Sequence, residues 1–121
     1  MSLDIYLTEA ARKCPNCGIA LTEPLSLEVF SANITHNLSA MAAEAGIYRH
    51  LWRPEEVPIT KAHDLIEPLK AAIMAMEAEP GRFDRLNASN GWGTREQFLP
   101  WLETLLKACL EYPESEVRSS R

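Results

Sequence analysis

The fold is decided by Leu3-Asp4-Ile5-Tyr6-Leu7-Thr8, in which apolar and polar side chains alternate. This is the period of a strand that is buried on one face, so Leu3, Ile5 and Leu7 are expected to face a core. Residues 19–22 and 27–30 are also typical of short strands and are separated by Pro24. The sequence therefore predicts a sheet of two or three strands near the amino end. Residues 116–119 are a candidate for an additional edge strand.

The middle of the chain has the spacing of helices. One apolar face with intervals of three and four residues is formed by Leu38, Met41, Ala42 and Ala45. Asn37 or Thr35 is expected to cap the start of this helix, and Gly46 is placed to end it in the left-handed conformation. Residues 48–52 predict one further short helical turn before a proline-stiffened connection.

Two longer helices are expected in the carboxyl-terminal half. The first begins near Thr60 and ends before residues 80–81, and Pro68 is expected to kink or break it. The second begins at a capping-box pattern, Thr94-Arg95-Glu96-Gln97, and contains Pro100 at a second expected kink. Cys109 lies on its apolar face and is expected to be a core residue.

These elements predict one α+β domain over residues 1–121. Residues 1–30 are expected to be rich in strands, residues 31–112 mainly helical, and residues 113–121 a tail or an edge strand. The expected architecture is a small antiparallel sheet of two to four short strands packed against three or four helices.

Charge and hydropathy exclude several classes of function. The chain has 12 basic and 17 acidic side chains and a formal charge of −5, which makes nucleic acid an unlikely partner because such binding rests on dense Lys and Arg. The longest wholly apolar run, residues 71–76, is far shorter than the ~20 residues of a membrane span. Residues 1–7 lack the cationic start and long apolar run of a signal peptide. We therefore expect a cytoplasmic protein without membrane contact.

The turn Cys14-Pro15-Asn16-Cys17-Gly18 is the candidate metal site. A two-residue gap lets both sulfur atoms point at one ion, so Cys14 and Cys17 predict half of a zinc site. No second such pair exists to supply the other ligands. The alternatives are a tight hairpin turn with two thiols that bind nothing and, less favoured, a redox pair.

A first polar cluster lies where a strand is expected to pass into a helix. Asn33, Thr35, His36 and Asn37 all fall in residues 31–37. Ligands often meet backbone amides at such junctions, and His36 has the chemistry of an acid, a base or a metal ligand. The alternative is a helix cap in which Thr35 or Asn37 serves the backbone and His36 packs beside it.

A second cluster precedes the last helix, in Asn87-Ala88-Ser89-Asn90-Gly91-Trp92-Gly93-Thr94. Asn90 and two glycines suit a loop that exposes amides to an anion, while Trp92 stacks on a flat or cationic ligand and Arg95 adds charge. The spacing of a phosphate-binding P-loop is absent. The alternative is an Asn-Gly turn whose Trp92 fills the core.

Several of these strings together resemble a family of small uncharacterised proteins encoded by bacteriophages and bacteria. The strings are Ala32-Asn33-Ile34-Thr35-His36-Asn37-Leu38, Ala45-Gly46-Ile47-Tyr48, Leu51-Trp52-Arg53-Pro54-Glu55-Glu56, Asn90-Gly91-Trp92-Gly93-Thr94 and a closing Ser-Arg. The resemblance covers residues 30–121 and implies no particular activity. It directs attention to His36 and Trp92, because polar loop residues are often functional.

No hydrolase elbow, zinc-protease motif or dinucleotide fingerprint occurs in the chain, so the sequence favours a binding module over an enzyme. We expect a non-catalytic module or inhibitor of phage or mobile-element type that holds a small polar or anionic ligand or a host protein. The expected binding residues are Asn33, Thr35, His36, Asn37, Trp52, Asn90, Trp92 and Arg95. The alternatives are a small hydrolase or transferase on a nucleotide-like substrate with His36 as general acid or base, and a zinc-stabilised structural module.

Overall fold

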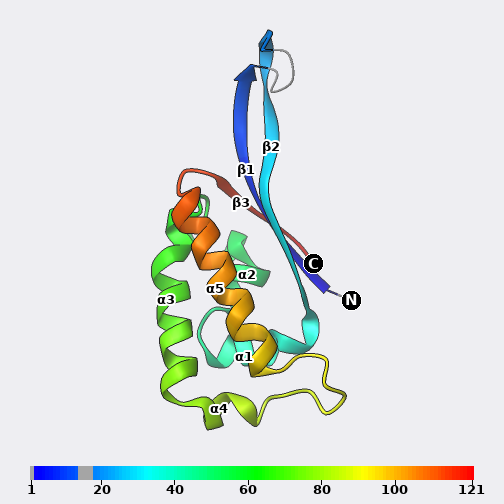
Figure 1. Cartoon of the computed structure of the whole chain (residues 1–121), viewed down its shortest axis with the longest axis vertical. Helices are drawn as coiled ribbons and strands as arrows, with labels where there is room; N and C mark the ends of the chain where they lie inside the picture. Colours follow the sequence, from blue (N-terminus) through cyan, green and yellow to red (C-terminus); the bar gives the residue numbers. More distant parts are fainter. Residues whose placement is uncertain (1, 14–17) are drawn as a thin grey trace.

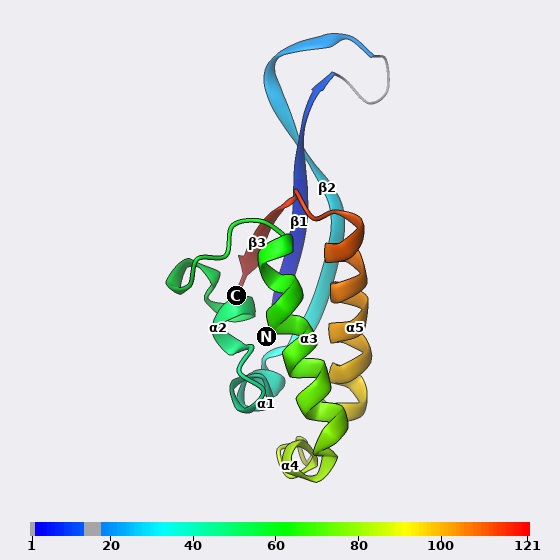
Figure 2. The same ribbon diagram turned by 90° about the vertical axis from the view of Figure 1, so that its left-hand side faces the viewer.

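The computed structural model describes residues 2–13 and 18–121 and has an α+β fold, as predicted. Three antiparallel strands form one sheet in the order β2-β1-β3, and helices lie over one face of it (Figures 1 and 2). The elements are β1 (Ser2–Lys13), β2 (Ala20–Thr35), the 3₁₀ turn η1 (His36–Leu38), α1 (Ser39–Glu44), α2 (Tyr48–Trp52), the 3₁₀ turn η2 (Pro54–Glu56), α3 (His63–Ala78), α4 (Pro80–Asp84), α5 (Arg95–Glu111) and β3 (Glu116–Ser120).

The alternation in β1 determines which face of the sheet is buried. Leu3, Ile5 and Leu7 have no exposed surface, as predicted, and face the helices. In the register of β1 with β2, Leu3 lies opposite Ile34 and Ser2 opposite Thr35. A slip of one residue would turn the three apolar side chains to solvent, so burial fixes this register.

The strands are longer than the sequence suggested. Residues 19–22 and 27–30 were expected as separate strands, but β2 runs without a break from Ala20 to Thr35. Pro24 is tolerated because β2 is an edge strand and because the pairing with β1 is irregular between Ala11 and Lys13. The β1–β2 hairpin consequently extends far beyond the helices (Figure 1), and the passage from strand to helix falls at Thr35 rather than near residue 30.

The long helices α3 and α5 lie side by side against the sheet (Figures 1 and 2). A kink or a break was predicted at Pro68; the break does not occur, because α3 continues through this residue as one helix. Leu65 and Leu69 are fully buried on either side of that proline, and this packing holds the helix together. The predicted capping box at the start of α5 is confirmed, with Thr94 and Gln97 each bonded to the backbone of the other.

Other local predictions also agree with the structure. Gly46 has φ of 77° at the end of α1, and β3 forms the predicted edge strand beside β1. Cys109 is fully buried in the core, and burial raises the pKa of its thiol to about 12. This thiol is therefore protonated and inert at neutral pH. Within residues 2–13 and 18–121, none of the helices has the length and apolar character needed to cross a membrane.

Candidate functional site

A cavity of about 910 Å³ lies at the end of the sheet where β2 passes into η1. Its lining comes from segments far apart in the sequence: the start of β1, the end of β2, η1, α1, α2, the loop before α5 and the residue after β3. The lining residues are Ser2, Asn33, Thr35, His36, Asn37, Ser39, Tyr48, Trp52, Arg53, Trp92 and Arg121.

The structure brings the two predicted polar clusters together in this cavity. Six of the expected binding residues line it, namely Asn33, Thr35, His36, Asn37, Trp52 and Trp92. Asn90 and Arg95 lie outside the lining. The Asn90 carboxamide oxygen accepts a hydrogen bond of 2.9 Å from the Trp92 amide, and Arg95 makes an ion pair of 2.7 Å with Asp84. These two residues shape the loop instead of facing the cavity.

A hydrogen bond between two side chains sets the chemistry of His36. The indole Nε1–H of Trp52 donates to Nδ1 of His36 over 2.8 Å, and Trp52 is only 2% exposed. Because an indole nitrogen can only donate, Nδ1 must be the unprotonated nitrogen of a neutral imidazole. The ring proton is then on Nε2, which makes no hydrogen bond to the described residues. His36 therefore presents an N–H donor to the cavity.

Aromatic packing supports the position of this pair. The rings of Tyr48 and Trp52 stack with centroids 5.5 Å apart and planes inclined by 12°. The short helix α2 presents both rings on one face because they are four residues apart. Trp52 therefore stacks on Tyr48 and donates to His36, and all three side chains belong to the cavity wall.

The loop before α5 contacts Asn37 of η1 at two points. The side-chain amide of Asn37 donates to the Trp92 carbonyl over 2.8 Å. Gly93 is buried with φ of 116°, and a Cβ atom built on it would lie 2.9 Å from the Asn37 Cβ atom. Only glycine allows so close an approach in this conformation. Thr35 and Asn37 also act as a cap, since the Thr35 hydroxyl accepts from the Asn37 amide over 3.2 Å.

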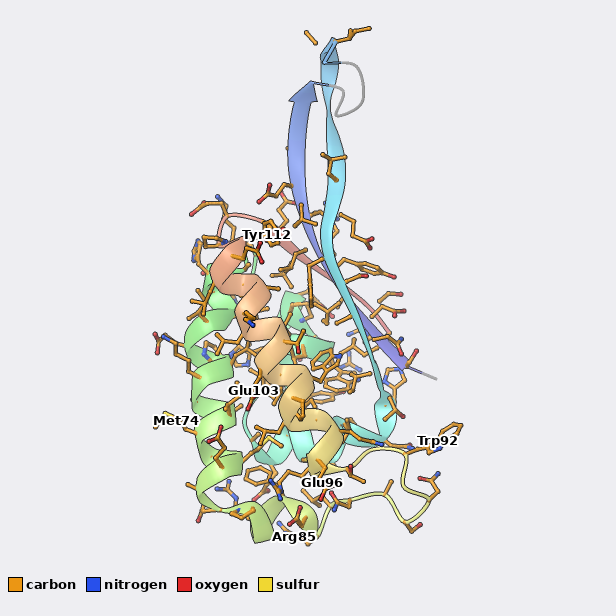
Figure 3. All side chains as sticks on the ribbon, in the orientation of Figure 1. Met74, Arg85, Trp92, Glu96, Glu103 and Tyr112 are labelled. Atoms are coloured by element: carbon orange, nitrogen blue, oxygen red, sulfur yellow. The ribbon has the colours of Figure 1, made fainter. Side chains whose placement is uncertain are left out.

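The same loop exposes Trp92 while its backbone is held firmly. The Gln97 carboxamide accepts from the amides of Gly93 and Thr94 over 2.9 and 3.2 Å and donates to the Gly91 carbonyl over 3.2 Å. Trp92 itself is 72% exposed and extends away from the helices beside the end of β2 (Figure 3). The alternative in which Trp92 fills the core is therefore wrong.

Sequence reasoning missed the two cations of the cavity. Among the described lining residues, Arg53 and Arg121 are the only ones that carry a charge at neutral pH. Nη1 of Arg121 donates to the Trp52 carbonyl and to the Glu55 carboxylate, both over 2.9 Å. Arg53 lies 3.4 Å from Glu56. Both arginines belong to strings that carry the family resemblance: Arg53 to residues 51–56 and Arg121 to the closing Ser-Arg. Neither string indicated a role in binding.

Neighbouring groups shift the pKa values of Arg53 and Glu55, which lie at or beside the cavity. The Tyr48 hydroxyl and then Glu56 raise the pKa of the Arg53 guanidinium above its ordinary value. Backbone hydrogen bonding is the largest cause that lowers the pKa of Glu55; burial opposes it, and the ion pair with Arg121 adds to the lowering. Both ion pairs are exposed, with side-chain exposures of 42–56%, so each contributes little to stability and is readily exchanged.

The predicted zinc ligands Cys14 and Cys17 lie outside the described residues, and zinc binding there stays a prediction. Among residues 2–13 and 18–121, no three His, Cys, Asp or Glu side chains gather closely enough to hold a metal ion.

Comparisons with protein-family models, with curated proteins and with solved structures found no match to this chain. The resemblance to phage and bacterial proteins stays a prediction, and function is inferred below from the geometry of the cavity.

The close approach of the two loops predicts different costs for two glycine substitutions. Gly91→Ala is expected to lower the free energy of unfolding by about 1 kcal/mol, because a side chain at φ of 78° is strained but meets no atom within 4 Å. Gly93→Ala adds a clash with Asn37 and is expected to cost about 2–4 kcal/mol. Urea denaturation of both variants measures this difference. Equal costs would contradict the close contact between the loop and η1.

The Trp52–His36 hydrogen bond predicts a single imidazole tautomer. In a long-range ¹H–¹⁵N spectrum at pH 7.5, His36 is expected to carry its proton on Nε2. His63 is the contrasting ring, because its Nδ1 lies 3.2 Å from the Asp64 carboxylate, which can only accept a hydrogen bond. Trp52→Phe removes the donor, so His36 is expected to populate both neutral tautomers while the other histidines stay unchanged. It is also expected to lower stability by about 1–3 kcal/mol. A proton on Nδ1 in the unaltered protein would contradict the hydrogen bond.

Proposed function

We propose that the chain is a non-catalytic binding module that holds a small anionic ligand in the cavity between His36 and Trp92. The observation that supports this most strongly is the charge of the lining: in a chain of net charge −5, both charged lining residues that the structure describes are arginines. A concave site with a few convergent polar groups is also what small ligands require.

Arg121 has N–H groups that are available to bind an anion. Arg121 uses only Nη1 in its contacts with described residues, which leaves Nε and Nη2 for a ligand. A guanidinium presents its donors in a planar fork that matches the oxygens of a phosphate or a carboxylate. Because Glu55 is an exposed partner, a ligand oxygen can replace it at little cost.

The tautomer of His36 favours binding over acid–base catalysis. A general base at Nε2 would need its proton on Nδ1, where the Trp52 indole N–H already donates. Nε2–H instead suits hydrogen bonding to an anion. We therefore place the hydrolase or transferase hypothesis second to the binding hypothesis.

Titration calorimetry with ribose 5-phosphate, and with ribose as the uncharged control, tests this proposal. Saturable binding of the phosphate ester without binding of ribose is expected. Arg53→Gln and Arg121→Gln are each expected to weaken it about 10- to 100-fold, because each removes charged hydrogen bonds.

Arg118→Gln is the matched control. Arg118 is on β3, is 63% exposed and pairs with Glu116 at 3.1 Å, but does not line the cavity. Its substitution is expected to leave affinity within about twofold. Three results would contradict the proposal. The affinity could fall equally in all three variants, it could persist in both Arg53→Gln and Arg121→Gln, or the unaltered protein could show no binding.

A further inference from the structure

Trp92 is an exposed aromatic ring on a fixed backbone. Among the described residues, four large apolar side chains are exposed, namely Ile19, Met74, Trp92 and Leu110, and of these Trp92 lines the cavity. Its amide donates to Asn90, its carbonyl accepts from Asn37, and glycines with positive φ stand on both sides. Hydrogen bonds thus hold the backbone that carries the indole, while the ring itself is exposed, an arrangement that suits contact with a ligand.

The cavity is also larger than an anionic group requires. Its volume of about 910 Å³ falls near the upper end of the roughly 300–1,000 Å³ typical of sites for whole organic ligands. Arg53 directly follows α2, and Arg121 directly follows β3. Trp92 comes from the loop before α5 (Figure 3). A ligand that uses both features needs an anionic end and a flat apolar end.

We propose that the ligand is an aromatic phosphate ester of the nucleoside monophosphate class, with its ring stacked on Trp92 and its phosphate held by Arg53 and Arg121. This inference rests on the proposed function and adds the chemical class of the ligand. Stacking on an indole is favourable for every nucleobase, because each base has an aromatic face. His36 Nε2–H and the hydroxyls of Ser2 and Ser39 supply donors for the sugar and the phosphate between the two ends.

Calorimetry with the 5′-monophosphates of adenosine, guanosine, cytidine and uridine tests the ring contact, with ribose 5-phosphate as the reference without a base. At least one nucleotide is expected to bind about 5- to 150-fold more tightly than ribose 5-phosphate. Trp92→Ala is expected to remove this advantage, so that the nucleotide binds about as weakly as ribose 5-phosphate does, while Trp92→Phe keeps part of it. Met74→Ala, at a side chain of matching exposure (71%) on α3, is expected to change neither.

The outcomes separate the two proposals. If ribose 5-phosphate binds and no nucleotide binds more tightly, the nucleotide inference is overturned and anion binding stands. If Trp92→Ala weakens both ligands equally, Trp92 only shapes the loop, and the stacking is likewise overturned. If neither ribose 5-phosphate nor any nucleotide binds, or if adenosine binds as tightly as its monophosphate, the proposed function itself fails.

Discussion

The register between β1 and β2 is the constraint on which the rest of the structure depends. Burial of Leu3, Ile5 and Leu7 beneath the helices allows one pairing, and that pairing ends with Ser2 opposite Thr35. The chain leaves the sheet at this point and turns directly into η1, which places His36 beside Trp52 of α2. The cavity is therefore a consequence of where the strand ends, because its lining takes Asn33 and Thr35 from the last residues of β2 and His36 and Asn37 from the turn that follows.

Local patterns in the sequence predicted the helices and strands, whereas the site depends on contacts between residues that are far apart in the chain. The alternation in β1, the Thr94 capping box and the terminating Gly46 act within a few residues, so the sequence alone indicated them. Pro24 and Pro68 were interpreted as interruptions because edge position and core packing are not visible in sequence. The role of Arg121 could not be predicted, since it depends on a contact with Trp52, 69 residues earlier in the chain.

The distribution of charge reconciles an acidic protein with a site for anions. Many of the carboxylates are paired with basic side chains away from the cavity, as Glu44 is with Arg82 and Glu114 with Lys61. Near the cavity, Glu55 pairs with Arg121 and Glu56 with Arg53, but neither glutamate lines the cavity. The net charge argues against binding of nucleic acid over an extended surface, whereas the cavity lining favours a small anionic ligand.

The central claim, that this cavity is where an anion binds, is tested most directly by nuclear magnetic resonance during a titration with inorganic phosphate. The account predicts saturable shifts at the Nε–H groups of Arg53 and Arg121 and at the His36 ring. The cluster of Arg82 and Arg85 beside Glu44, which is equally basic but lies outside the cavity lining, should stay unchanged. Shifts that do not saturate, or that centre on Arg82 and Arg85, would contradict it.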